Sequence, residues 1–446
     1  MIEEFEIRGE WWLGRSPEMK AAGGLHFNPR EGAKLELNGR IRAGTSPFPE
    51  TFILGESTTG DEITLYGCEP LGGTSSFRGS GTSSFQAMYI FNGIHFKSRD
   101  DMRFINSSVR FNNLDEWVGK YGFKQRIGKN GFDYLVGYKA PNRITVPIDD
   151  NIDLSIGFRY SSRPQGYKKY LLEQETVISF RSKEPIDYLN YSELTFHFQN
   201  LLTLAITLPI YPIQIKFTYI DETENSEKDI DFFFRLNQIP DINNPVHALH
   251  MLFSLKDIEE ELVEYLQNWY KKRARLNPIV DLYFGTFYNP HMYMQTRFLN
   301  IIQGIESYDR RLGNNAEIDP AKYEKKIGRI YSKLSSRDKS WLKWKLKYAN
   351  EPSLKSRLVR VFKARKERIV PMVGSLDAFV EKVKNTRNYL THFDEELEDL
   401  AAHGGELGGI TQTLTMLLES ILLEELGFKP DKVTEMQRNR SRLPFY

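Results

Sequence analysis

Two patterns of hydrophobic and polar positions divide this sequence. Up to about residue 240, short runs rich in β-branched and aromatic residues lie between clusters of turn residues, which is typical of strands. In several runs apolar and polar positions alternate, as around Leu35, Leu37 and Ile41, which indicates sheets with one face in water. We therefore predict a β-rich sandwich or barrel-like first half. The predicted strands are KLELNGRI, TFILGES, EITLYGCE, AMYIFNGIHF, NRITVPI, LSIGFRYSS, TVISFRS, IQIKFTYI and IDFFFRL.

One segment of this half does not alternate. The stretch SELTFHFQNLLTLAIT, near residues 192–207, is apolar enough to be a strand or a buried helix. We favour a helix here.

The periodicity changes after PDINNP, residues 240–245, where two prolines and two asparagines punctuate the chain. We place a domain boundary here, with domains at 1–243 and 244–446. In RFLNIIQGIESYDRR, Phe298, Ile301, Ile302, Ile305 and Tyr308 share one helical face. Helical patterns also cover 257–275, 320–348, 353–368, 373–390 and 409–426. The prediction is an α+β multidomain protein whose second half is an all-helical bundle of six or seven members.

Length and composition support this division. A chain of 446 residues exceeds what one hydrophobic core usually organises. The single cysteine, Cys68, has no partner for an internal disulfide, and the start of the chain lacks a basic and then apolar leader. Since no run approaches about 18 apolar residues, we expect a soluble protein of the reducing cytoplasm with no membrane partner.

The net charge of +1 conceals a strong local asymmetry. Residues 317–370 hold 17 Lys and Arg against 6 Asp and Glu, a net +11, whereas residues 388–428 hold 9 acids and no Lys or Arg. Arg357, Arg360 and Lys363 recur at three-residue spacing and are the candidate RNA-binding residues. The alternative is a solvated helical face whose long basic side chains cover apolar surface.

The candidate chemistry lies in RNYLTH, residues 387–392. RNA is cleaved without metal when its 2′-hydroxyl attacks the adjacent phosphorus, a reaction that needs proton transfer and stabilisation of added negative charge. His392 suits the role of general acid or base, and Arg387 offers a cationic fork to phosphate oxygens. Asn388 is the candidate for orienting either partner. In the alternative interpretation, Arg387 pairs with Asp394 or Glu395 and His392 caps a helix.

Spacing alone carries little weight here. With 30 Arg and 8 His in the chain, about half of one Arg-x4-His match is expected by chance, and requiring Asn lowers this about twentyfold. Residues five apart on a helix are also about 140° out of phase, so a helix end or a composite groove is needed to unite them.

The surroundings of the motif add to its weight. RNYLTH resembles the Arg-polar-x3-His motif of the HEPN superfamily of helical ribonucleases, and it lies before a strongly apolar last helix, ITQTLTMLLESILLEELG. The segment RFLNIIQGIESYDRR is similar to the early helix of the Apea-like HEPN branch. The first half, with GEWWL, GGLHFNP, KLELNGRI and GDEITLYGC, resembles the N-terminal domain of the ApeA family of bacterial anti-phage defence proteins.

The resemblance implies a function and a site. It gives Arg387 and His392 as catalytic residues and Asn388 as their polar support, with no metal or other cofactor. It implies a homodimer or higher oligomer, because HEPN nucleases pair two motifs in one cleft. It further implies that the β-rich domain senses an unidentified phage-derived trigger, after which cleavage of RNA, with tRNA as one candidate, limits phage spread in abortive infection.

Other residues invite chemical interpretation, and for each we favour a structural role. His247 and His250 lack a third metal ligand nearby, so we expect packing and capping. The loop of residues 72–81 is rich in glycine but lacks the Gly-Lys-Ser/Thr ending of a phosphate-binding loop, and we interpret it as a mobile loop. Trp11 and Trp12 are expected to pack in a core or between domains, and Cys68 to be a small buried residue.

Two acidic features of the sequence allow more than one interpretation. Glu306 could approach the cleft or pair with Arg310 along its own helix. The run DEELED, residues 394–399, is expected to be a solvated helix start rather than a metal cluster. We weigh one further hypothesis for the run: it repels RNA at rest, or binds the basic segment 317–370 of a partner subunit.

The leading hypothesis is thus a metal-independent HEPN endoribonuclease regulated by its N-terminal domain. The alternative is a non-catalytic RNA-binding or protein-interaction module in which Arg387 and His392 are structural.

Overall fold

The computed structural model describes the chain except residues 40, 42–51, 76–80, 129–133, 222, 224, 314 and 442–446. The chain folds into two compact units, Met1–Gln267 and Asn268–Tyr446. The strands lie in the first unit, and most of the helical residues in the second. The predicted fold class, a β-rich part followed by an all-helical part, is confirmed.

Fourteen strands of the described part of the first unit form one antiparallel sheet, in the order β12-β13-β14-β9-β15-β16-β8-β5-β4-β1-β2-β3-β7-β6. Strands β10 and β11 form a separate hairpin. The bounds are β1 Phe5–Leu13, β2 Ala21–Asn28, β3 Gly32–Asn38, β4 Ile53–Ser57, β5 Glu62–Tyr66, β6 Glu69–Ser75, β7 Gly81–Ala87, β8 Tyr89–Asn92, β9 Arg103–Phe111, β10 Phe123–Ile127, β11 Tyr134–Tyr138, β12 Ile144–Pro147, β13 Ile152–Pro164, β14 Tyr170–Asp187, β15 Pro212–Asp221 and β16 Ser226–Phe234.

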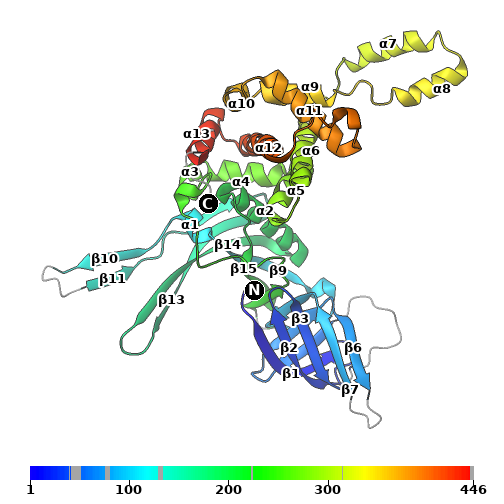
Figure 1. Ribbon diagram of the computed structural model, residues 1–446. Coiled ribbons are helices and arrows are strands. Elements are labelled where there is room, and N and C mark those ends of the chain that lie inside the picture. The colour runs from blue at the N-terminus through cyan, green and yellow to red at the C-terminus, as the bar shows by residue number, and fades with distance from the viewer. Residues whose placement is uncertain are drawn as a thin grey trace. The chain divides into compact units, whose positions relative to one another are not determined.

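Strands β1 to β8 curve round one hydrophobic cluster (Figure 1). Trp11, Leu35 and Leu37 lie in it almost without exposure, because alternate residues of each strand face the same side. Cys68 is buried in the same cluster. The expected core roles of Trp11 and Cys68 are therefore confirmed, and Trp12 is buried as well.

The ambiguous apolar segment is a helix, as predicted. Helix α2, Tyr188–Ile206, begins where the Asp187 carboxylate accepts the Leu189 N–H at 2.7 Å. It packs on β9 and β14, and its Phe198 contacts the rings of Phe111, Phe180 and Trp117. One face of these strands is therefore covered, while the opposite face is polar. The other short helices of this unit are α1, Leu114–Val118, and α3, Leu255–Ile258, and α4, Leu262–Lys271, crosses into the second unit.

The second unit is built round α6, Met294–Leu312, which contacts α5, α9, α11 and α12. Its predicted apolar face is confirmed, since Phe298, Ile301, Ile302 and Ile305 are buried. The remaining helices are α5 Arg273–Tyr288, α7 Pro320–Tyr331, α8 Ser336–Lys345, α9 Leu354–Lys363, α10 Lys366–Val373, α11 Leu376–His392, α12 Gly404–Leu426 and α13 Pro430–Ser441.

The predicted number of helices was too low. The pattern at 320–348 is two helices, because the chain turns at residues 332–335, and the pattern at 353–368 is divided between α9 and α10. Helix α5 was not predicted, since Pro278 lies inside it and proline usually interrupts a helix.

Candidate functional site

The motif RNYLTH forms the last two turns of α11. The helix begins at the cap Ser375 and ends at Phe393, whose backbone is left-handed (φ 52°) and whose N–H donates to the Tyr389 carbonyl at 2.6 Å. The chain then leaves through the acidic run and re-enters a helix at α12. The motif therefore lies at a helix end, one of the two settings that its spacing requires.

A buried threonine fixes this helix end. Thr386 has no exposed surface, and its hydroxyl donates to the Lys382 carbonyl at 2.7 Å and accepts the Ala402 N–H at 2.9 Å. Ala402 itself is buried and lies just before α12. The position of Arg387, the next residue along the chain, is thereby set by a contact between α11 and the segment that leads into α12.

Arg387 pairs with an acid on α6. Its Nη2 lies 3.5 Å from Glu306 Oε2, and its Nη1 donates to Asn388 Oδ1 at 3.3 Å. About a third of the Arg387 side chain is exposed, so donors of its guanidinium stay accessible to a ligand. Glu306 therefore approaches the motif, while Arg310 pairs with Glu351 at 2.5 Å instead. In the described residues, neither Asp394 nor Glu395 forms an ion pair with Arg387.

His392 is the last residue of α11 and is exposed. Across the residues that the structure describes, its ring has no hydrogen bond or ion pair. No contact joins it to Arg387 either, as their offset round the helix predicts. In a single copy of the motif, the partly exposed Arg387 and the exposed His392 are thus accessible but do not contact each other.

The acidic run packs beside the motif. The Tyr389 hydroxyl donates to Glu398 Oε1 at 3.3 Å, and its ring lies edge-on to His403 with centroids 5.6 Å apart. Desolvation and the Glu398 carboxylate raise the pKa of Tyr389. The expected solvated start is observed as a short turn of helix at Glu395–Leu397, capped by Asp394. Among the described residues, no group of three His, Cys, Asp or Glu side chains could hold a metal ion.

The proposed RNA-binding residues of α9 need correction. Arg357 is buried and pairs with Asp309 at 3.1 Å and Glu351 at 3.4 Å. Arg360 makes two contacts with the same Asp309, through Nε at 2.8 Å and Nη2 at 2.5 Å. A buried guanidinium that is paired with two carboxylates is not accessible to a phosphate. The prediction that Arg357 binds RNA is therefore wrong. Arg360 is partly engaged, and Lys363 is exposed.

The other candidates behave structurally. His247 Nδ1 accepts the Leu249 N–H and caps a turn of 3-10 helix at Ala248–His250, which confirms capping. Of the glycine-rich loop 72–81, residues 76–80 lie outside the described part, while its two ends belong to β6 and β7. Thr386 was missed, although its spacing from the buried Val380 and Val383 places it on the apolar face of α11.

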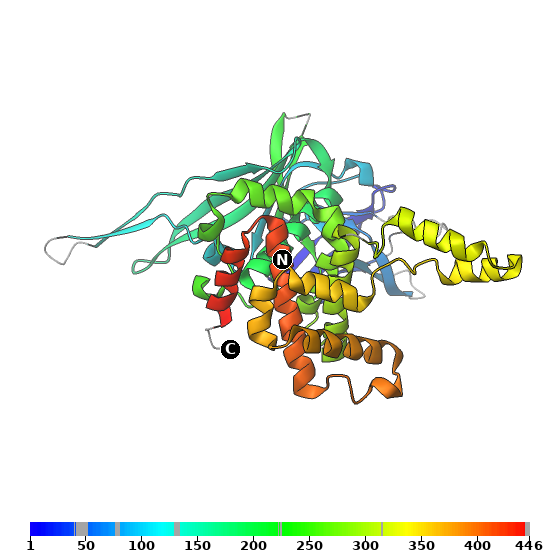
Figure 2. The same ribbon diagram turned by 90° about the horizontal axis from the view of Figure 1, so that it is seen from above.

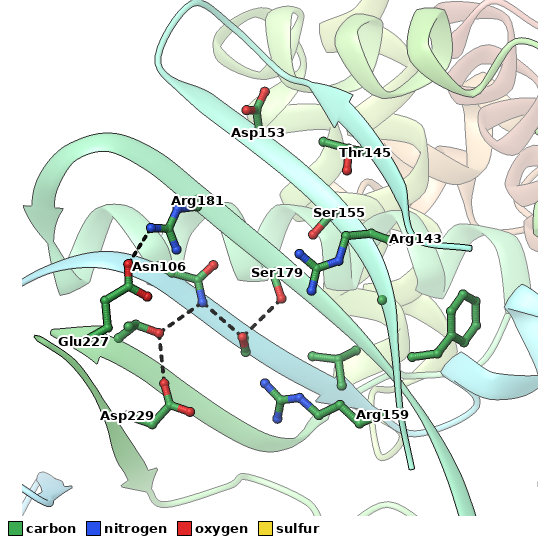
Figure 3. A pocket seen from close by; sticks show the side chains of 15 residues that line it. Asn106, Arg143, Thr145, Asp153, Ser155, Arg159, Ser179, Arg181, Glu227 and Asp229 are labelled. Carbon is green, nitrogen blue, oxygen red and sulfur yellow. Dashed lines mark hydrogen bonds and ion pairs between the residues drawn. The ribbon is translucent and has the colours of Figure 1, made fainter. Parts of the chain in front are cut away.

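The polar face of the first unit carries a pocket of about 290 Å³ (Figure 3). Its floor is a chain of hydrogen bonds in which the Asn106 amide donates to Ser108 and Thr218, and Ser108 contacts Ser179. Arg181 pairs with Glu227 at 2.6 Å, and this guanidinium lowers the pKa of Glu227.

Two further arginines line the same pocket, Arg143 before β12 and Arg159 on β13. Neither forms an ion pair with any residue that the structure describes. Gly157 lies beside Arg143, since a Cβ there would be in ordinary van der Waals contact with its Nε at 3.5 Å. The pocket thus combines two available guanidinium groups with hydroxyls and carboxylates.

Taken together, a β-rich unit and a helical unit with an Arg-Asn-x3-His helix end define a HEPN-type protein with an attached β-rich domain. Residues 6–269 match the family model for ApeA N-terminal domain 1, and residues 299–432 match that for Apea-like HEPN. The chain belongs to the ApeA family. No curated protein and no solved structure matches it.

The HEPN match covers the motif, the acidic run and most of α6, including Glu306. A HEPN domain points to ribonuclease-type chemistry. In the described residues, no helix is both long and apolar enough to cross a membrane.

Proposed function

We propose that this protein is a metal-independent endoribonuclease of anti-phage defence, held in check by its N-terminal unit until a phage-derived trigger appears. The observation that carries the proposal is the accessible pair Arg387 and His392 at one helix end of an Apea-like HEPN domain. Its place of action is the cytoplasm, and cleavage of RNA, with tRNA as one candidate substrate, would halt translation in the infected cell.

In the proposed reaction, the RNA 2′-oxygen attacks phosphorus and the 5′-oxygen leaves, so the products carry a cyclic phosphate and a 5′-hydroxyl. His392 transfers protons, and Arg387 stabilises the negative charge that develops on the phosphoryl oxygens. Asn388 and Glu306 hold the Arg387 fork from two sides, through contacts at 3.3 and 3.5 Å. These groups accomplish the chemistry without a metal ion.

The proposal includes a homodimer. One motif leaves Arg387 and His392 apart, and the surface beside it exposes the apolar side chains of Phe393 (69%) and Leu400 (50%). Exposed apolar side chains next to a candidate site often mark an interface. If two motifs face one cleft, mixed dimers of Arg387→Ala and His392→Ala chains contain one Arg and one His, and should regain cleavage that neither variant has alone.

The first unit supplies the proposed sensor. Its polar pocket, with Arg143 and Arg159 available, suits recognition of an acidic group on the trigger. Replacing both arginines with glutamine should abolish the response to infection while leaving the helical unit folded.

The test compares the wild type with His392→Ala on total cellular RNA in excess EDTA, with an extract of phage-infected cells added to supply the trigger, and during phage infection of cells that carry the gene. We expect cleavage and growth arrest with the wild type, and neither with His392→Ala. His291→Ala is the matched control, since His291 is another exposed histidine of the same unit. Equal cleavage by His392→Ala would refute the site.

The alternative function is a non-catalytic RNA-binding or interaction module. It is favoured by the Arg387–Glu306 pair, which gives Arg387 a structural partner. RNA binding by both the wild type and His392→Ala, with no cleavage even in infected cells, would support this alternative.

A further inference from the structure

Helices α7 and α8 form a hairpin that lies apart from the packed helices of its unit. In both views they lie side by side and project away from the others (Figures 1 and 2). Neither helix has a buried residue. We name residues 320–348 the basic hairpin.

The stem of the basic hairpin is closed by a clasp of three hydrogen bonds. The N–H of Glu317 donates to the Asn350 carbonyl at 2.8 Å, and the N–H of Ile318 to Asn350 Oδ1 at 3.0 Å. The Asn350 amide donates back to the Ile318 carbonyl at 2.8 Å. The clasp fixes where the hairpin leaves the bundle.

The basic hairpin carries ten Lys and Arg against two acids, Glu324 and Asp338. Asp338 is engaged locally, because it accepts the Ser335 hydroxyl at the start of α8. All ten cations are exposed, and none forms an ion pair with a residue in the described part of the chain. They are Lys322, Lys325, Lys326, Arg329, Lys333, Arg337, Lys339, Lys343, Lys345 and Lys347.

Three large aromatic side chains are exposed among these cations. Trp341, Trp344 and Tyr348 are 62%, 70% and 64% exposed. The two tryptophans are three residues apart on α8 and so lie on one side of it, and Tyr348 follows in the turn after the helix. The ammonium of Lys345 lies 4.9 Å from the Trp344 ring, and that of Lys347 lies 5.0 Å from the Tyr348 ring. The hairpin does not need these rings for its own packing, since other apolar residues are half-buried in it, among them Ile327, Leu342 and Leu346.

We infer that the basic hairpin binds unpaired RNA, with bases stacked on Trp341 and Trp344 and phosphates held by the neighbouring lysines. This inference rests on the proposed ribonuclease function for its choice of ligand. Stacking needs exposed flat rings, and a phosphate backbone needs cations at short intervals between them, which is how α8 is built.

A membrane surface is a poorer fit. A helix that lies on a membrane needs a broad apolar face. Lysines 339, 343 and 345 of α8, and Lys347 just after it, are interleaved with the tryptophans, and the leucines between them are half-buried in the hairpin. The hairpin thus adds a binding surface for the substrate of Arg387 and His392, on the same helical unit.

The experiment measures the affinity of full-length His392→Ala protein for a fluorescein-labelled, unstructured oligoribonucleotide. Adding Trp341→Ala and Trp344→Ala should weaken binding by about 5- to 150-fold for each stacked base that is lost. Trp341→Phe with Trp344→Phe should retain most of the affinity, because phenylalanine keeps a stacking face. Tyr293→Ala, which removes another exposed ring of the same unit, should leave the affinity unchanged.

The salt dependence tests the cations. Lys343→Gln with Lys345→Gln should reduce the slope of log affinity against log salt by up to about 1.4, since each phosphate contact with a single strand contributes about 0.7. Lys168→Gln with Lys169→Gln removes the same charge from an exposed turn of the first unit and should leave the slope unchanged.

Several outcomes would overturn the inference. The tryptophan double variant could bind RNA as the wild type does, or it could lose only binding to vesicles of anionic lipid, which would favour a membrane. If the wild type cleaves RNA and the hairpin variants cleave it with the same kcat/KM, the hairpin role is wrong and the function stands. If the wild type never cleaves but the hairpin variants lose RNA binding, the hairpin role stands and the function is wrong.

Discussion

Replacing Asp309 with alanine should destabilise the helical unit substantially. The Asp309 carboxylate is 4% exposed and accepts hydrogen bonds from both Arg357 and Arg360. Its removal leaves the Arg357 cation, also 4% exposed, with Glu351 at 3.4 Å as its remaining ion-pair partner. Breaking a buried pair costs about 3–5 kcal/mol. Glu351 still offsets part of the Arg357 charge, and Arg360 is 40% exposed and so reaches water. We therefore expect a loss of unfolding free energy at the lower end of this range, about 3 kcal/mol.

The assay is thermal unfolding followed by calorimetry. At about 2–4 °C per kcal/mol for a domain of this size, the Tm of the helical unit should fall by roughly 6–12 °C. Arg310→Ala is the control, since Arg310 lies on the same helix and makes an exposed pair with Glu351 that is worth about 0–1 kcal/mol. An unchanged Tm for Asp309→Ala would refute the reasoning. The reasoning would also be refuted if Arg357→Ala left the stability unchanged but weakened RNA binding, since Arg357 would then be a surface residue that binds RNA.

Three further predictions concern single side chains. Thr386→Val leaves the buried Ala402 N–H without an acceptor, which should cost about 1–3 kcal/mol in chemical denaturation and displace the motif, so that cleavage falls as well. Burial raises the pKa of Cys68 to about 12, so the native thiol should stay unreacted with Ellman's reagent at pH 8, and its contribution to stability should decline as the pH rises from about 9 towards 12. Gly55→Ala should destabilise the first unit by about 1–3 kcal/mol, because the added Cβ would lie 2.3 Å from the buried Trp11 ring.

Each of these has a matched comparison. Thr413→Val removes the hydroxyl of a half-buried threonine that donates to the carbonyl of Gly409, four residues earlier on the same helix, so the stability of this variant should be near that of the wild type. Rapid labelling of native Cys68 would contradict its burial. Gly137→Ala has open space around the new Cβ and should be tolerated, and an equal loss of stability in both glycine variants would remove the clash as the explanation.

Sequence patterns predicted the fold well where they are local. The alternation round Leu35 and Leu37 and the apolar stripe of α6 both follow from burying one face of an element. Helix α5 escaped prediction because Pro278 argues locally against a helix, whereas Leu276 and Ile279 are buried in tertiary contacts that hold it.

The candidate site was predictable only in part. The segment that carries Arg387 and His392 was visible in the sequence, but the partner of Arg387 was not, since Glu306 lies on another helix. For Arg357 the sequence was misleading. Its place in a run of basic residues suggested a surface role, but it pairs in the core with the buried Asp309, 48 residues earlier. Pairings between distant helices depend on the packing of the bundle, which a local pattern does not contain.

The clasp at Glu317, Ile318 and Asn350 makes the basic hairpin an exchangeable part. The hydrogen bonds of the clasp hold the two ends of the hairpin together. The entropy lost when a loop is closed grows only slowly with its length, so the number of residues beyond the clasp has little effect on stability. The basic hairpin can therefore be shortened, lengthened or given other side chains while α11, which carries Arg387 and His392, stays in place. Under the proposed function, selection can then alter which RNA the hairpin binds without changing the residues that cleave it.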